Sequence, residues 1–180
     1  MSDLVTVILA AGKGTRMKSK LPKVLHKAGG KTMLQHVIDA AKAAGAKRNI
    51  VVTGFGGEMV REAIGDQAEF VTQTEQLGTG HAVLQTKDLL KDETGTVMVL
   101  CGDTPLLTGA LLKKLYDEHV AAEAKATVLT AIMPDATGYG RIIRSADGSV
   151  ENIVEHKDAT AEERELRDLN TRIYFFAAQH

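Results

Sequence analysis

Apolar residues follow two patterns along this chain. Short unbroken runs of apolar and β-branched residues are typical of strands buried on both faces. Such runs predict strands at residues 4–9, 49–53, 69–73, 96–101, 126–132 and 170–177. Apolar residues three and four positions apart predict helices at residues 32–44, 59–64, about 80–90 and 108–123. Alternating strands and helices indicate a mostly parallel sheet covered by helices.

The last third of the chain departs from this alternation. Asp147-Gly148 is a tight-turn dipeptide, and it lies between predicted short strands at 141–144 and 150–155. Thr160 and Glu163 have capping-box spacing, which predicts the start of a short helix. We therefore expect a three-layer α/β/α Rossmann-like fold with a mostly parallel central sheet and a small β-hairpin insertion.

Length and composition exclude several classes of protein. A chain of 180 residues with 44% hydrophobic residues is sufficient for one globular domain. The net charge of −1 gives no overall basic field for nucleic acid. The single cysteine cannot form an internal disulfide. Without a leader or a membrane-length apolar run, we expect a cytoplasmic protein with no membrane partner.

The stretch after the first strand carries the strongest chemical signal. Bulk falls away after Leu9 at Ala10 and Ala11, and Gly12 and Gly14 follow. Exposed backbone N–H groups in such a loop can bind phosphate oxygens. Cations surround the loop at Lys13, Arg16, Lys18 and Lys23. This combination favours a polyphosphate ligand, and a plain glycine-rich turn is the alternative.

Two known phosphate-binding patterns do not fit this stretch. The dinucleotide fingerprint requires a third glycine where this chain has Met17. Gly30-Lys31-Thr32 matches the end of a Walker loop, but Leu25 occupies the position of its first glycine. The loop therefore follows another pattern, and a dinucleotide-dependent oxidoreductase is the weakest alternative.

Two later stretches also follow predicted strands. Ligands of such sheets lie beyond the carboxyl ends of the strands. Gln73 could read a base edge with its amide, although Thr79 could simply cap a helix. We interpret His81 as structural. Asp103 could hold Mg²⁺ beside a polyphosphate, or it could be a turn or cap residue.

Several motifs together resemble one enzyme family. The first is L-A-A-G-K-G-T-R-M with L-P-K, and the next two are Q-L-G-T-G-H-A and G-D-T-P-L. The later ones are G-Y-G-R-I, V-E-H-K-D-A-T and N-T. The chain resembles the sugar-nucleotide pyrophosphorylases along its whole length, and is most similar to the uridyltransferases that act on N-acetylglucosamine 1-phosphate.

The resemblance implies a reaction and a site. UTP and N-acetylglucosamine 1-phosphate would give UDP-N-acetylglucosamine and pyrophosphate with Mg²⁺, in the supply of peptidoglycan and lipopolysaccharide precursors. Arg16, Lys23 and Asp103 would be catalytic, and Asp103 would hold the metal. At Cys101 the family often has an aromatic residue; we interpret this cysteine as a small buried hydrophobe. The implied substrate contacts are Leu9, Ala10, Ala11, Gly12, Gly14, Thr15, Lys23, Gln73, Gln76, Gly78, Thr79, Cys101, Gly102, Gly140, Glu155 and Asn170.

The resemblance also implies what would follow residue 180. The family's transferase domain continues and supplies a second metal ligand, and a β-helical acetyltransferase domain, through which full-length members trimerise, comes after it. We therefore expect a single transferase domain that stops before its natural end. Cytidylyl- or thymidylyltransferase activity on the same fold remains an alternative, and so does a non-catalytic nucleotide-binding module.

Overall fold

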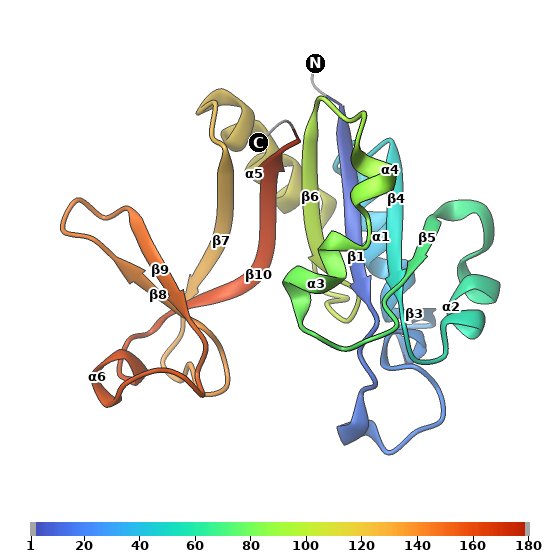
Figure 1. Cartoon of the computed structure of the whole chain (residues 1–180), viewed down its shortest axis with the longest axis horizontal. Helices are drawn as coiled ribbons and strands as arrows, with labels where there is room; N and C mark the ends of the chain where they lie inside the picture. Colours follow the sequence, from blue (N-terminus) through green and yellow to red (C-terminus); the bar gives the residue numbers. More distant parts are fainter. Residues whose placement is uncertain (1–2, 179–180) are drawn as a thin grey trace. The chain divides into compact units, whose positions relative to one another are not determined.

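The computed structural model describes residues 3–178, except for the side chain of Arg16. The chain divides into two compact units (Figure 1). Unit 1 comprises the chain up to Thr127 together with the segment from Tyr174 onward, and unit 2 is Val128–Ile173. Two strands, β7 (Ala126–Ile132) and β10 (Asp168–Ala177), contribute residues to both units. Each unit is described separately below.

Unit 1 contains the predicted parallel sheet. In spatial order its strands are β5 (Glu69–Thr72), β4 (Arg48–Thr53), β1 (Leu4–Ala10), β6 (Thr96–Cys101) and the end of β10. The first four are parallel, whereas β10 runs antiparallel to β6. Leu9 pairs with Val52 on one side and with Cys101 on the other. The carboxyl ends of three neighbouring strands therefore meet at one edge.

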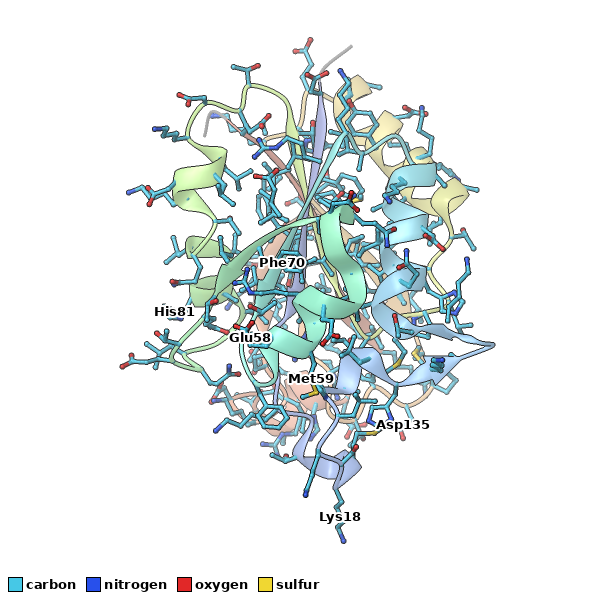
Figure 2. All side chains as sticks on the ribbon, turned by 90° about the vertical axis from the view of Figure 1, so that its right-hand side faces the viewer. Lys18, Glu58, Met59, Phe70, His81 and Asp135 are labelled. Atoms are coloured by element: carbon cyan, nitrogen blue, oxygen red, sulfur yellow. The ribbon has the colours of Figure 1, made fainter. Side chains whose placement is uncertain are left out.

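Helices cover both faces of this sheet (Figure 2). On one face α1 (Met33–Ala43) packs against α5 (Gly109–Ala121). On the other lie α3 (Thr79–Leu84) and α4 (Lys87–Leu90), and α2 (Gly57–Ile64) connects β4 to β5. The remaining elements are the 3₁₀ turns Thr15–Met17, Lys23–Leu25 and Gly65–Gln67 and the small pair β2 (Lys27–Ala28) and β3 (Lys31–Thr32). This is the expected three-layer α/β/α arrangement.

The sheet residues explain why both faces are covered. Successive side chains of a strand point to opposite faces. On the α3 face, Val7, Val52 and Val99 form one buried cluster with Ala82. On β1 the alternate residue Ile8 is also completely buried. A strand that is apolar on both faces is stable only between two helical layers.

The predicted helix at 80–90 is wrong in one respect, because it is two short helices. The break follows Gln85, where the hydroxyl of Thr86 donates to the carbonyl oxygen of Val83 at 2.7 Å. The Thr86 backbone N–H donates to the same oxygen at 2.9 Å. This side-chain bond competes with regular helical hydrogen bonding, and Thr86 is completely buried.

Unit 2 contains the predicted hairpin and capped helix. Strands β8 (Arg141–Arg144) and β9 (Val150–Val154) pair antiparallel. The Thr160–Glu163 capping box begins α6 (Ala161–Arg164), as predicted. Arg141 is 2% exposed, and its guanidinium donates to the carbonyl oxygens of Ala136, Tyr139 and Arg164. One buried cation therefore ties the loop before β8 to the end of α6.

Candidate active site

The glycine-rich loop begins where β1 ends. Gly14 has a left-handed φ of 56°, and its carbonyl oxygen accepts from the Met17 N–H at 2.8 Å. A Cβ added to Gly14 would lie 2.8 Å from Cβ of Lys23. Glycine is therefore required here both by the backbone conformation and by the close approach of Lys23. The loop and Lys23 form one packed element.

Gly12 differs from Gly14, since neither its backbone nor its neighbours require glycine. Its φ is not in the left-handed region, and no described atom outside its two chain neighbours lies within 4 Å of the position of an added Cβ. Gly12 lines a cavity at this edge of the sheet. The space beside Gly12 is therefore open to a ligand.

Lys23 and Asp103 form an ion pair at the same edge. Nζ of Lys23 donates to Oδ2 of Asp103 at 2.6 Å, and the side chains are 41% and 33% exposed. The turn that carries Asp103 is tied to β1, because the Gly102 N–H donates to the Leu9 carbonyl oxygen at 2.9 Å. Asp103 is not a helix cap: Thr108 caps α5, accepting from the Leu111 N–H at 3.2 Å. Two predicted catalytic side chains are thus in contact.

The donor set near Asp103 fits a metal shared with a substrate. Among residues 3–178, no group of three or more His, Cys, Asp or Glu side chains is arranged to hold a metal ion. A single half-exposed carboxylate does not make a protein cage. Mg²⁺ commonly keeps several waters and takes its other ligands from phosphates. Asp103 suits that mode of binding.

The cavity has a volume of about 230 Å³ and lies between the loop and α3. Gln76 crosses to the loop, where its Nε2 donates to the Ala11 carbonyl oxygen at 2.9 Å. Gln73 is 4% exposed, and its Nε2 donates to the Gly78 carbonyl oxygen at 3.1 Å. Thr79 is the first residue of α3 rather than its cap, which is Gly78. The lining residues are Leu9, Ala11, Gly12, Gln73, Gln76, Gly78, Thr79 and Ala82.

The other predicted site residues of unit 1 differ in how well their positions in the structure agree with the predictions. Ala10 is buried at the end of β1, and Thr15 is exposed in its 3₁₀ turn. Cys101 is partly exposed at the end of β6, so its interpretation as a buried hydrophobe is wrong. Its carbonyl oxygen accepts from the hydroxyl of Thr104 at 2.8 Å. The side chain of Arg16 lies outside the described residues, and its role stays a prediction.

Sequence reasoning missed Gly54, which supports the cavity from the end of β4. A Cβ there would lie 2.7 Å from the Ala11 carbonyl oxygen and 3.0 Å from Nε2 of Gln76. Glycine therefore permits the contact between Gln76 and the loop. The sequence signal was present, because Gly54, Gly56 and Gly57 follow a buried strand at the same edge.

The residues predicted to bind the sugar lie together in unit 2. Asn170 donates its backbone N–H to the Gly140 carbonyl oxygen at 2.9 Å. A Cβ on Gly140 would lie 3.5 Å from Oε1 of Glu155 and 3.6 Å from Cβ of Asn170. Arg172 contacts Glu155 across 3.5 Å. Three residues far apart in sequence therefore form one small cluster.

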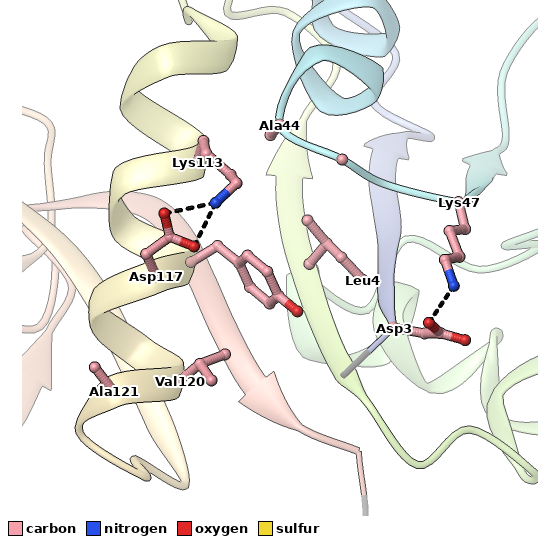
Figure 3. A pocket seen from close by; sticks show the side chains of 10 residues that line it. Asp3, Leu4, Ala44, Lys47, Lys113, Asp117, Val120 and Ala121 are labelled. Carbon is pink, nitrogen blue, oxygen red and sulfur yellow. Dashed lines mark hydrogen bonds and ion pairs between the residues drawn. The ribbon is translucent and has the colours of Figure 1, made fainter. Parts of the chain in front are cut away.

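A second hollow of about 420 Å³ lies near the opposite end of β1 (Figure 3). It lies between the segment after α1 and one side of α5. Its charged groups pair with one another, Lys47 with Asp3 and Lys113 with Asp117. The lining residues are Asp3, Leu4, Ala44, Gly45, Lys47, Lys113, Tyr116, Asp117, Val120 and Ala121. This hollow has no glycine-rich loop. We therefore place the candidate active site at the edge of the sheet where the carboxyl ends of β4, β1 and β6 meet, called the carboxyl edge below.

Some ionisable groups away from this edge have shifted pKa values, and three of them show two causes, ion pairing and burial. A hydrogen bond from Arg48 lowers the pKa of Glu69, and one from Lys31 lowers the pKa of Asp39. Burial lowers the pKa of His119, which is 3% exposed and bonds to Thr127. The first two shifts arise from surface ion pairs, and the third arises from a core histidine.

Comparison with known proteins supports the predicted family. The sequence model of the family described as "MobA-like NTP transferase domain" matches residues 6–146 of this chain. "Bifunctional protein GlmU" of Geobacillus thermodenitrificans is 56% identical over 170 residues, which cover 94% of this chain. The protein of the same name from Levilactobacillus brevis is 51% identical over 99% of the chain. The chain spans 37% and 39% of the lengths of these relatives.

Solved structures support the fold. A UDP-glucose pyrophosphorylase complexed with UDP-glucose superposes with a TM-score of 0.77 at 19% identity, over 99% of this chain and 77% of that one. A putative glucose-1-phosphate thymidylyltransferase from Bacillus anthracis gives 0.78 at 18% identity, over 98% of this chain and 72% of that one. At these identities the likeness shows the fold alone.

These findings agree with the geometry of the carboxyl edge. In residues 3–178, no helix is both long and apolar enough to span a membrane. The predicted α/β/α fold is confirmed, and so is the predicted nucleotidyltransferase class. Because the family model matches most of the length of this chain, the chain belongs to the MobA-like NTP transferase domain family.

Proposed function

We propose that the chain transfers a uridylyl group from UTP to N-acetylglucosamine 1-phosphate and releases pyrophosphate. One observation carries this proposal. The open loop at Gly12, the Lys23–Asp103 pair and the Gln73 cavity converge on the carboxyl edge of one sheet. That edge is where ligands of such sheets bind. The similarity to proteins named GlmU supports a sugar-nucleotide product.

The reaction needs positioning more than acid–base chemistry. The attacking oxygen belongs to the phosphate of the sugar 1-phosphate and is already anionic, so no general base is needed. It would attack the α-phosphorus in line, and pyrophosphate would leave. Backbone N–H groups of Gly12–Thr15 and the Arg16 side chain would bind the β- and γ-phosphates. Holding these groups in place and offsetting their charge supply most of the catalysis.

Lys23 and Asp103 have complementary roles in this proposal. Asp103 would hold Mg²⁺ together with phosphate oxygens and water. When bound, Mg²⁺ supplies positive charge that offsets the charge developing on the phosphates. Lys23 would move from Asp103 to the reacting phosphate, since its stem already packs against the loop at Gly14. An ion pair this exposed contributes roughly 1 kcal/mol or less, so breaking it when Lys23 moves to the phosphate costs little free energy.

Selectivity would come from two groups of residues. Gln73, Gln76, Gly78 and Thr79 would bind uracil and ribose, with Leu9 to Ala11 and Cys101-Gly102 lining the nucleotide. In unit 2, Gly140, Glu155 and Asn170 would contact the sugar. Their mutual proximity supports a shared role for these three residues.

Pyrophosphate release tests the proposal directly. The purified chain would be given UTP, CTP, dTTP or ATP, each with N-acetylglucosamine 1-phosphate or glucose 1-phosphate and with or without Mg²⁺. We expect release to be fastest with UTP, N-acetylglucosamine 1-phosphate and Mg²⁺. Preference for CTP or dTTP would favour the corresponding rival transferase. UTP binding without pyrophosphate release under any condition, both from this chain and from one extended through the rest of the expected transferase domain, would favour a non-catalytic module.

A further inference from the structure

His81 contacts Gln73, the residue that binds the uracil base in the proposed function. It is in the first turn of α3 (Figure 2). Its ring lies between two glutamine side chains. Nδ1 lies 3.0 Å from Nε2 of Gln73, and the ring Nε2 lies 3.2 Å from Nε2 of Gln85. Neither partner is a carboxylate, so this is not a catalytic dyad. The contacts can instead fix how the Gln73 amide is oriented.

The Gly78 carbonyl oxygen determines which end of the Gln73 amide faces His81. A carbonyl oxygen can only accept, so the group 3.1 Å from it must be the NH₂ of Gln73. Nδ1 of His81 lies 3.0 Å from the same nitrogen, within hydrogen-bond distance of its second N–H. With both N–H groups used, the amide atom that remains for a ligand is the acceptor Oε1.

The imidazole must then carry its proton on Nε2. A neutral histidine has one ring nitrogen that donates and one that accepts. Gln85 also presents an amide nitrogen, which already donates to the His81 carbonyl oxygen at 3.0 Å. The two glutamines compete for a single lone pair. Gln73 is 4% exposed whereas Gln85 is only partly buried, and an unpaired group costs more when buried, so Gln73 takes the lone pair.

We propose that His81 is a positioning residue for base selectivity: its unprotonated Nδ1 holds the Gln73 amide so that Oε1 faces the base. This inference rests on the proposed function. The central group of the uracil edge is N3–H, which can donate a hydrogen bond to Oε1. Cytosine presents an acceptor at N3. Without the Nδ1 lone pair, only the Gly78 carbonyl oxygen still holds the NH₂ group of Gln73. The amide then turns more readily and offers N–H to the cavity, which suits cytosine.

The test compares equilibrium binding of UTP, CTP and 5-methyl-UTP at one Mg²⁺ concentration. His81→Leu keeps a side chain of similar volume but removes the nitrogen lone pair. We expect the preference for UTP over CTP to fall roughly tenfold in this variant. His81→Asn places an amide oxygen near the position of Nδ1 and should restore the preference. His81→Gln reaches the position of the other ring nitrogen and should not. Gln85→Ala is the matched control and should leave selectivity unchanged.

Two further readouts separate positioning from a merely structural role. The base edge of 5-methyl-UTP is the same as that of UTP, so its affinity relative to UTP should not change in any His81 variant. Nitrogen-15 spectra of the wild-type imidazole should show the proton on Nε2 and none on Nδ1. A proton on Nδ1 would overturn the proposal without any variant.

The outcomes distinguish this inference from the proposed function. Wild-type protein that prefers UTP, with the same preference in His81→Leu and His81→Gln, would contradict only the role of His81. Wild-type protein that binds neither nucleotide, or binds both equally, would contradict the uridine assignment and the role of His81 together.

Discussion

Substituting Gly12 by alanine should weaken nucleotide binding without weakening the fold. The position has a φ outside the left-handed region, and no described atom outside its two chain neighbours lies within 4 Å of the added methyl group. Replacing glycine at such a position commonly stabilises a protein by about 0.4–1 kcal/mol, because the unfolded chain loses freedom. We therefore expect the free energy of unfolding of Gly12→Ala to be unchanged or slightly raised.

The same methyl group would occupy the space that the proposed function gives to phosphate. Forcing a methyl group into an occupied space typically costs about 1–3 kcal/mol. At 1.4 kcal/mol for each tenfold change, this predicts UTP binding that is weaker by roughly five- to 150-fold. Titration calorimetry with UTP would measure the affinity, and urea denaturation would measure stability.

Gly54→Ala is the matched control, because the same added methyl group has the opposite surroundings. It would lie 2.7 Å from the Ala11 carbonyl oxygen, so this variant should lose roughly 1–3 kcal/mol of stability. If Gly12→Ala binds UTP as tightly as wild type, the ligand does not approach the loop at Gly12. If Gly12→Ala is as destabilised as Gly54→Ala, the open space beside the loop is not real.

Three other substitutions test separate parts of the account. Asp103→Asn should abolish Mg²⁺-dependent turnover and leave the fold intact, which turnover measured against Mg²⁺ concentration would show. It should also free Lys23 to bind UTP without metal up to about fivefold more tightly, as measured by titration in the absence of Mg²⁺. Arg16→Ala should reduce turnover by roughly a hundredfold with little change in stability, and normal turnover would remove Arg16 from the phosphate site. Burial lowers the folded-state pKa of His119, so the unfolded chain takes up its proton first, and the free energy of unfolding should be constant above pH 6.5 and decrease below it. His119→Asn should reduce that decrease, as measured by urea midpoints from about pH 7.5 to 5.5.

Much of the fold follows from local pattern. The strand at β1 is a continuous apolar run, and its burial on both faces is the consequence expected of a parallel sheet. The break between α3 and α4 could not be predicted, since it depends on the hydroxyl of Thr86 rather than on apolar spacing. The Thr160 capping box could be predicted, because its bonds join residues only three apart.

The candidate site was only partly predictable. Family motifs identified Lys23 and Asp103, but nothing in the sequence places residues 80 positions apart at 2.6 Å. Gly54 was missed because its role depends on Gln76 crossing to the loop. His81 was interpreted as structural, and its contact with Gln73 appears only in the folded chain. Contacts across strand ends arise from topology, which short-range spacing does not encode.

The central claim is that a uridine nucleotide binds at the carboxyl edge of the unit 1 sheet. The most direct measurement is a titration of nitrogen-15-labelled chain with UTP and Mg²⁺, followed by backbone amide shifts. The account predicts that the largest shifts fall at Gly12, Gly14, Gly78 and Gly102, with little change around the hollow near the start of β1 (Figure 3). Shifts concentrated at Gly45 and Val120, or no shifts with saturating UTP, would contradict it.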